Sequence, residues 1–178
     1  MSPRAVLVGP PGSGKSTIGT RLAEELGVEF RDTDADVEAK AGKPIGDIFL
    51  EEGEQHFRAL EREAVREALA AHDGVLALGG GAILAEETQE LLAAHRVVYL
   101  EVSLGEAVKR VGLASARPLL VFNPRSQLRK LLEERLPIYQ RLAKITVVTT
   151  DRSEEEIVAE LAAALAASSE QTEPTEET

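Results

Sequence analysis

The sequence reads Gly9-Pro10-Pro11-Gly12-Ser13-Gly14-Lys15-Ser16 directly after the apolar run Ala5–Val8 and before a segment with helical spacing, Lys15–Leu26. A strand, a glycine-rich turn and a helix N-terminus in this order turn backbone N–H groups and the positive end of the helix dipole toward one anionic group. Lys15 adds a positive charge for the β- and γ-phosphates of a nucleotide, and the Ser16 hydroxyl is suited to bind Mg²⁺. Every fixed position of the pattern G-x4-G-K-S/T is filled. The stretch therefore predicts a nucleotide phosphate site rather than a chance match in a glycine-rich turn.

Composition favours one soluble domain. The 178 residues and 43% hydrophobic content suffice for one substantial core, and the absence of cysteine excludes disulfides, thiolate metal sites and cysteine nucleophiles. The formal net charge of −11 argues against a general binder of nucleic acid or of anionic membranes. No basic segment with an apolar core precedes Ala5, and the longest uncharged stretch, Gly74–Ala85, is far shorter than the ~20 residues of a membrane span. We therefore expect a cytoplasmic protein, and its acidic surface favours a monomer.

Short apolar runs alternate with helix-patterned segments along the chain. This alternation is typical of βαβ units and predicts an α/β fold with a parallel sheet covered on both faces. The predicted strands are Ala5–Val8, Val28–Asp32, Val75–Leu78, Val97–Glu101 and Ile145–Thr149. The predicted helices are Lys15–Leu26, Asp34–Ala41, Ile45–Glu52, Glu54–Ala71, Ala85–Ala94, Leu104–Val111, Ser126–Leu142 and Glu154–Ala166.

Two segments fall outside this alternation. Gly112–Arg125 lacks clear periodicity and contains Pro118 and Pro124, so we interpret it as a long loop and, because long loops in compact domains often cover sites, as a lid. Ser168–Thr178 has four glutamates, one proline and no large apolar residue, which predicts a disordered acidic tail. One folded domain is therefore expected over residues 1–167.

Two carboxylates close the second predicted strand, in the sequence Asp32-Thr33-Asp34. The carboxyl ends of parallel strands face the ligand crevice, and alternate residues of an extended segment point the same way. One aspartate is then a candidate for Mg²⁺ binding through water, and the other for contact with a substrate hydroxyl. The alternative is that either aspartate caps the following helix.

The third predicted strand runs into Gly79-Gly80-Gly81. It lacks the acidic residue that many nucleotide-hydrolysing proteins place there for the metal, which leaves Asp32 as the nearest candidate. Three glycines at the carboxyl end of a strand allow a small ligand to pack against bare backbone and accept its hydrogen bonds. A tight turn is the alternative interpretation.

Four arginines occupy positions that suggest a role: Arg58, Arg110, Arg117 and Arg135. Apolar spacing on the predicted helix Glu54–Ala71 indicates a buried stripe, with Arg58 and Glu61 beside it. Arg58 has Glu54 four residues before it and Glu61 three after it, spacings at which ion pairs can hold a guanidinium. Arg117 lies in the predicted loop, and the other two lie on the helices that flank it. Taken singly, each arginine also fits a solvated surface ion pair.

The order of these motifs resembles that of shikimate kinases, over about Arg4 to Leu165. The matching stretches are the phosphate loop, Asp32-Thr33-Asp34, Phe57-Arg58-Ala59-Leu60-Glu61, Gly79-Gly80-Gly81, Arg117-Pro118-Leu119-Leu120 and Arg135-Leu136-Pro137-Ile138-Tyr139. The resemblance implies a three-layer α/β/α fold like that of P-loop nucleoside monophosphate kinases. It also implies a five-stranded parallel sheet, a lid over about 112–125 and a small substrate-binding subdomain over about 33–61. The implied reaction is ATP-dependent phosphorylation of the 3-hydroxyl of shikimate, a step of aromatic amino-acid biosynthesis through chorismate.

Carried over position by position, the resemblance also implies roles for individual residues. Asp34 would contact the hydroxyls of shikimate, and Arg58 and Arg135 would bind its carboxylate. The backbone of Gly79, Gly80 and Gly81 would complete that pocket.

On the nucleotide side, the resemblance assigns the phosphates to one continuous run: Gly12, Ser13, Gly14, Lys15, Ser16 and Thr17. Mg²⁺ would bind Ser16 and, through water, Asp32. Arg117 would reach the transferring phosphate from the lid, while Arg110 and Arg152 would flank the adenine. Lys15, Asp34 and Arg117 are the implied catalytic residues.

Two other classes share parts of this pattern. Another small-molecule kinase on the same scaffold, such as a gluconate or nucleoside monophosphate kinase, would share the phosphate loop and the lid. The low aromatic content of 3% argues against a nucleotide as the acceptor, because few rings are left to stack on a second base. A GTP-dependent switch would need Asp-x-x-Gly after the third strand and Asn-Lys-x-Asp for guanine, and neither motif is present.

Overall fold

One parallel sheet forms the centre of the molecule. The computed structural model describes residues 2–113 and 124–170. Within them the strands are β1 (Ala5–Val8), β2 (Phe30–Asp32), β3 (Val75–Ala77), β4 (Val97–Glu101) and β5 (Ile145–Val148). They pair in the order β2-β3-β1-β4-β5, and every pair is parallel, with Leu7 opposite both Ala77 and Val98. The predicted α/β class and five-stranded parallel sheet are confirmed.

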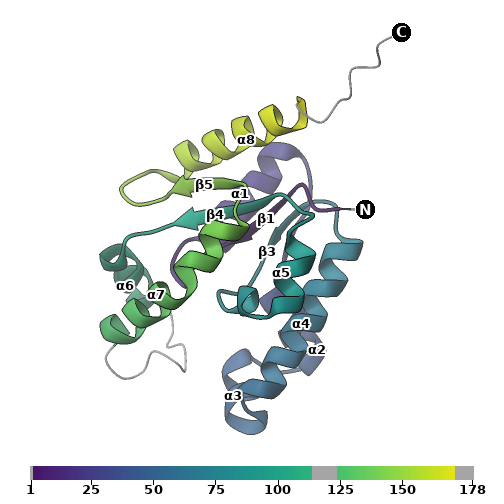
Figure 1. Cartoon of the computed structure of the whole chain (residues 1–178), viewed down its shortest axis with the longest axis vertical. Coiled ribbons are helices and arrows are strands. Elements are labelled where there is room, and N and C mark those ends of the chain that lie inside the picture. Colours follow the sequence, from purple (N-terminus) through teal and green to yellow (C-terminus); the bar gives the residue numbers. More distant parts are fainter. Residues whose placement is uncertain (1, 114–123, 171–178) are drawn as a thin grey trace.

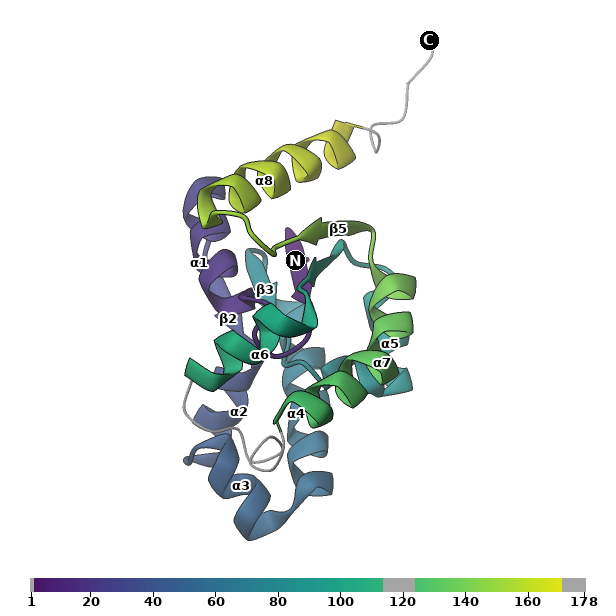
Figure 2. The same ribbon diagram turned by 90° about the vertical axis from the view of Figure 1, so that its left-hand side faces the viewer.

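Helices cover both faces of this sheet (Figures 1 and 2). The described helices are α1 (Lys15–Leu26), α2 (Thr33–Ala41), α3 (Ile45–Glu52), α4 (Glu54–Ala71), the 3₁₀ turn η1 (Ala82–Leu84), α5 (Glu86–Leu92), α6 (Leu104–Leu113), α7 (Pro124–Leu142) and α8 (Glu154–Glu170). Side chains that alternate along β1 point to opposite faces. Leu7 packs in one core with α1 and α8, and Val6 in a second core with α4, α5 and α7.

A close approach between α1 and β2 fixes the phosphate loop against the sheet. Gly19 of α1 is buried, and a Cβ atom added there would overlap the Phe30 ring and lie 3.1 Å from Leu7 Cδ1. Glycine removes this obstacle, so α1 lies directly on β1 and β2. The first turn of α1 is thereby held at the carboxyl edge of the sheet.

Helices α2, α3 and the first half of α4 project from the sheet as a small unit, seen at the bottom of Figure 1. This unit has its own apolar cluster, with Val37, Ile48 and Phe57 at its centre. An ion pair of 2.6 Å between Lys40 and Glu63 joins α2 to α4 at the surface. The unit covers the segment 33–61 that the resemblance assigned to substrate binding.

Several predicted boundaries are wrong by a few residues, for local reasons. Strand β2 begins at Phe30 instead of Val28, because the Val28 N–H donates to Ala23 O (2.9 Å) and helps to end α1. Strands β3 and β5 each end one residue early, and α5 spans only Glu86–Leu92. Helix α8 continues to Glu170, so residues 168–170 are helical instead of part of a disordered tail.

The two ends of the predicted loop Gly112–Arg125 are also wrong. Helix α6 runs to Leu113 and α7 begins at Pro124, so two residues at each end of that segment are helical. Residues 114–123, which include Arg117, lie outside the described residues, as do 171–178.

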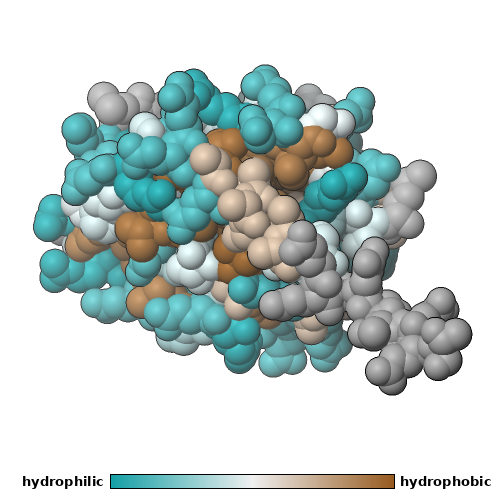
Figure 3. Space-filling view, turned by 90° about the horizontal axis from the view of Figure 1, so that it is seen from above, coloured by the Kyte–Doolittle hydropathy of each residue, from teal (hydrophilic) through white to brown (hydrophobic). Residues whose placement is uncertain are grey.

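On the face seen from the α8 end, hydrophilic residues surround smaller apolar patches (Figure 3). Every helix within 2–113 and 124–170 is too short or too polar to cross a membrane.

Candidate active site

The phosphate loop connects β1 to α1 and is shaped by its glycines. Gly12 (φ 80°) and Gly14 (φ 88°) adopt the left-handed conformation, which side-chain-bearing residues rarely do. A Cβ atom at Gly9 would lie 2.8 Å from Ser13 Oγ and 2.9 Å from Leu100 O, so the loop is packed too tightly for any side chain there. The shape of this turn therefore requires glycine at these positions.

The N-terminus of α1 is arranged to accept an anion. No side chain caps it, and its first turn contains no acidic residue, so its N–H groups and dipole are left for a ligand. Lys15, the first residue of the helix, bends back over the loop and donates hydrogen bonds to Gly9 O (2.7 Å) and Pro10 O (3.0 Å). A cation and the helix terminus thus face the same space.

Ser16 and Asp32 join the loop to the end of β2. The Ser16 hydroxyl donates to Asp32 Oδ2 at 3.0 Å, while Asp32 Oδ1 accepts the Asp34 N–H at 2.9 Å. Asp32 is therefore also the N-cap of α2. The prediction that Asp32 and Asp34 alternate on one extended strand is wrong, because the cap starts the helix at Thr33. The Ser16 hydroxyl oxygen and Asp32 Oδ2 nevertheless lie together beside the loop, and Mg²⁺ prefers oxygen ligands.

A cavity of about 330 Å³ opens at this point. Its lining residues are Gly12, Gly14, Lys15, Ser16, Thr17, Asp32, Asp34, Leu78, Gly80 and Arg110. Arg110 of α6 donates to Gly12 O (3.0 Å) and pairs with Glu106 (3.1 Å), so its guanidinium is held beside the loop. The cavity is thus lined by the predicted phosphate loop, both aspartates and Gly80 of the glycine triplet.

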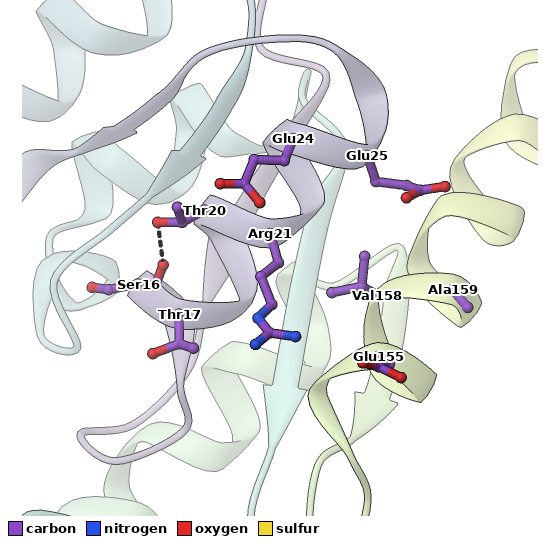
Figure 4. Close-up of a pocket in the computed structure, with 9 residues that line it drawn as sticks. All are labelled: Ser16, Thr17, Thr20, Arg21, Glu24, Glu25, Glu155, Val158 and Ala159. Atoms are coloured by element: carbon purple, nitrogen blue, oxygen red, sulfur yellow. Dashed lines mark hydrogen bonds between the residues drawn. The ribbon is translucent and has the colours of Figure 1, made fainter.

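A larger open groove of about 900 Å³ lies between α1 and α8 (Figure 4). It touches the phosphate loop at Ser16 and Thr17 and then follows the outer side of α1 toward Glu24. Arg21, which lines the groove, forms an exposed ion pair of 2.8 Å with Glu154. Although this groove is larger, the smaller cavity holds the converging charged groups, and we place the candidate active site there.

The three glycines after β3 lie among the predicted acceptor-binding residues. A Cβ atom on Gly79 would lie 2.5 Å from Asp34 Oδ1, and one on Gly81 would lie 2.7 Å from Arg58 Nη2. One on Gly80 would lie 3.2 Å from Arg135 Nη1. The bare backbone at the carboxyl edge of the sheet is thus surrounded by three charged side chains: Asp34 of α2, Arg58 of α4 and Arg135 of α7.

Glu61, the predicted ion-pair partner of Arg58, is also a member of this cluster, and it is buried instead of lying beside the buried stripe. Its residue is only 3% exposed, and its Oε1 accepts a hydrogen bond of 2.8 Å from Arg58 Nη1. Burial raises the pKa of Glu61, while the positive charges of Arg58 and Arg135 act in the opposite direction. The predicted pairing of Arg58 with Glu54 and Glu61 is confirmed, and the three-residue spacing was the signal for it.

One predicted nucleotide contact, Arg152, is not among the residues that line the cavity. It follows β5, donates to Val148 O (3.2 Å) and pairs with Glu156 and Glu160 of α8. Arg117 lies outside the described residues. The structure thus brings together the phosphate loop, Asp32, Asp34, Arg58, Arg110, Arg135 and the three glycines.

The phosphate loop lies beside a pocket with one carboxylate and two guanidinium groups, on a parallel sheet of the order β2-β3-β1-β4-β5. Together these features define a P-loop small-molecule kinase. Residues 11–166 match the family model for shikimate kinase. A shikimate kinase of Salinispora arenicola is 63% identical over 167 residues, which cover 94% of this chain and 100% of that protein. The chain belongs to the shikimate kinase family.

Solved structures agree with this assignment. Shikimate kinase from Acinetobacter baumannii in complex with shikimate superposes with a TM-score of 0.89 at 37% identity, covering 94% of each chain. A gluconokinase from Sinorhizobium meliloti gives a TM-score of 0.58 at 23% identity, covering 94% of this chain and 93% of that one, which is a likeness of fold alone.

Proposed function

We propose that this site transfers the γ-phosphoryl group of ATP to the 3-hydroxyl of shikimate, giving shikimate 3-phosphate and ADP. The observation that carries the proposal is the placement of Asp34, Arg58 and Arg135 around Gly79–Gly81, next to the phosphate loop. This arrangement offers one carboxylate for hydroxyl groups and two guanidinium groups for a carboxylate. A cyclic acid with several hydroxyls has both features.

In this proposal the phosphate loop binds ATP. The N–H groups of Gly12–Thr17 and the Lys15 ammonium bind the β- and γ-phosphates. Arg110, which is held beside Gly12, would flank the adenine. Ser16 and, through water, Asp32 would hold Mg²⁺, which offsets the negative charge of the phosphates when it is bound. The pair of oxygens 3.0 Å apart, beside the helix terminus, supports this assignment.

The acceptor is held by the second group of residues. Arg58 and Arg135 bind the carboxylate, because the planar fork of a guanidinium makes two parallel hydrogen bonds to such a group. Asp34 orients the 3-hydroxyl and is placed to accept its proton as the oxygen attacks the γ-phosphorus. A bond forms between that oxygen and phosphorus, and the bond from phosphorus to the β,γ-bridging oxygen breaks. Positioning and charge stabilisation account for most of the rate in such transfers.

The test is ADP release measured in parallel with shikimate, gluconate and AMP as acceptors. We expect release with shikimate to exceed that with the other two by at least about 100-fold, since only shikimate presents a ring carboxylate to both arginines. Lys15→Ala should abolish ATP use with every acceptor, which controls for a contaminating kinase. Equal release with gluconate would mean that the residues around Gly79–Gly81 do not select the acceptor.

We also propose that the chain acts as a monomer in the cytoplasm. Its net charge of −11 supports this, because like-charged surfaces repel one another. Size-exclusion chromatography with light scattering should give a mass near 19.1 kDa at all working concentrations.

A further inference from the structure

Tyr139 lies directly beneath the acceptor pocket. Its hydroxyl donates a hydrogen bond of 2.7 Å to Gly80 O, the carbonyl of the central glycine, and its side chain is fully enclosed at 1% exposure. The ring stacks on Tyr99 of β4 with centroids 5.1 Å apart and an interplanar angle of 12°. The ring is thus fixed in the core, and the hydroxyl points out of the core toward the site.

The same hydroxyl lies against Arg135, one helical turn earlier on α7. Side chains four residues apart on a helix are neighbours. The Arg135 guanidinium also lies against Gly80, since a Cβ atom there would be 3.2 Å from Arg135 Nη1, and its interaction with the Tyr139 hydroxyl raises the pKa of Arg135 against the effect of burial. A tyrosine hydroxyl has one proton to donate and lone pairs to accept with. Since its proton is directed to Gly80 O, its lone pairs are left for the guanidinium. One oxygen atom therefore links Arg135 to the backbone of Gly80.

Arg135 needs such a support more than Arg58 does. Arg58 forms an ion pair with Glu61 at 2.8 Å, whereas within 2–113 and 124–170 no carboxylate lies within ion-pair distance of Arg135. Arg135 is nevertheless only 6% exposed, and burial lowers its pKa. A neutral hydroxyl fixes the guanidinium without neutralising it. The guanidinium of Arg135 can then bind an anionic ligand.

We propose that Tyr139 is a positioning residue for recognition of the acceptor carboxylate, because its hydroxyl holds the Arg135 guanidinium and the Gly80 carbonyl in one fixed arrangement. This inference rests on the proposed function, in which Arg135 binds the carboxylate of shikimate. It adds a residue that touches no substrate and acts through two groups that do.

Tyr139→Phe removes the hydroxyl and keeps the ring with its stacking on Tyr99. A hydrogen bond to a charged group contributes enough that its loss should raise the KM for shikimate on the order of 10-fold. The KM for ATP should stay within about 2-fold, because the Tyr139 hydroxyl donates to Gly80 O and not to a group that binds ATP in the proposed function. Tyr99→Phe is the matched control, since it removes a hydroxyl from the other ring of the same stack and should leave both KM values unchanged.

A substrate variant separates positioning from general loosening of the fold. With shikimate carboxamide, which lacks the negative charge, Tyr139→Phe should change the KM by less than about 2-fold. A purely structural role would change the KM for both acceptors by the same factor. Equal factors for shikimate and its carboxamide would overturn the inference.

Arg135→Lys distinguishes failure of this inference from failure of the proposed function. If Arg135→Lys raises the KM for shikimate and Tyr139→Phe does not, only the positioning role is wrong. If Arg135→Lys leaves that KM unchanged, the assignment of Arg135 to the carboxylate is wrong as well.

A spectroscopic measurement covers the case in which Tyr139→Phe does not fold. The chain has two tyrosines and no tryptophan, so in Tyr99→Phe the near-ultraviolet tyrosine absorption comes from Tyr139 alone. Shikimate binding to Tyr99→Phe should shift this absorption, because the charge next to the hydroxyl becomes paired. Saturating shikimate without any shift would contradict the role of Tyr139.

Discussion

The Ser16 hydroxyl lies 3.0 Å from Asp32 Oδ2, and through this hydrogen bond the first turn of α1 meets the last residue of β2. Asp32 has two tasks there, since its other oxygen caps α2. A substitution that keeps one task and removes the other can separate metal binding from folding.

We predict that Asp32→Asn raises the Mg²⁺ concentration needed for half-maximal activity about 10-fold and leaves the free energy of unfolding nearly unchanged. Asparagine caps a helix as well as aspartate does but carries no charge for the metal. Asp32→Ala should add a loss of about 1 kcal/mol of stability through the missing cap. Activity titrated with Mg²⁺, together with urea unfolding, measures both effects. An unchanged Mg²⁺ requirement in Asp32→Asn would remove Asp32 from the metal site.

Asp34→Asn is predicted to lower kcat with shikimate by about 10²- to 10⁴-fold, because an amide cannot accept the proton of the acceptor hydroxyl. The KM for ATP should be unaffected, since Asp34 lies on the acceptor side, against Gly79. Steady-state kinetics with each substrate varied in turn measures both quantities. Full kcat in Asp34→Asn would refute the role given to this aspartate.

The buried carboxyl of Glu61 predicts a pH dependence of stability. Burial raises its pKa above the ordinary 4.5, so the native state holds this proton more tightly than the unfolded state does. Its contribution to stability is therefore greatest below pH 4.5 and falls as the pH rises through the folded-state pKa. The difference in free energy of unfolding between wild type and Glu61→Gln, followed by urea titration over this range, should decline with increasing pH. A flat or rising difference would contradict the raised pKa.

Gly19→Ala should destabilise the chain by about 1–3 kcal/mol, since the added methyl group would overlap the Phe30 ring. Gly105 of α6 is the matched control, because a Cβ atom there meets nothing within 4 Å. Gly105→Ala should be neutral or stabilise by up to about 1 kcal/mol through helix propensity. Urea unfolding of both variants gives the comparison. A neutral Gly19→Ala would show that α1 can move away from β2 without cost.

Both tyrosines should resist ionisation, with burial raising the pKa of Tyr99 and that of Tyr139 to about 12 from the ordinary 10.0. Ultraviolet titration should therefore show little tyrosinate in the folded chain at pH 10–11, where urea-unfolded chain is half or more ionised. Because the folded-state pKa values are the higher ones, stability should fall as the pH rises from 10 toward 12. Tyrosinate appearing at pH 10 without unfolding would contradict the burial of the hydroxyls.

Much of this fold is predictable from local patterns. Runs such as Ala5–Val8 and Val97–Glu101 have their bounds correctly predicted because they are buried from both faces and read as uninterrupted apolar segments. The boundary of β2 was missed because a backbone hydrogen bond of Val28 belongs to the end of the preceding helix, and apolar character alone does not reveal that.

The candidate site likewise has one part that local sequence patterns predict and one part that they do not. The phosphate loop is predictable from sequence because no other residue can replace its glycines. The cluster at Gly79–Gly81 is not, because its side chains come from three helices that are far apart in sequence and meet only in the fold. Helical periodicity places apolar residues in the core and does not predict the burial of Glu61, although its three-residue spacing from Arg58 predicts their ion pair. Tyr139 was equally hidden, since only the tertiary contact with Gly80 separates it from an ordinary core tyrosine.

The hydrogen bonds from Lys15 to Gly9 O and Pro10 O carry a consequence for how nucleotide is captured. The Lys15 ammonium group already bonds to main-chain oxygens of its own loop, so an incoming phosphate competes with these oxygens for the cation. When nucleotide binds, Lys15 exchanges its main-chain hydrogen bonds for bonds to phosphate. Because the loop is already ordered, binding costs little conformational entropy of the chain.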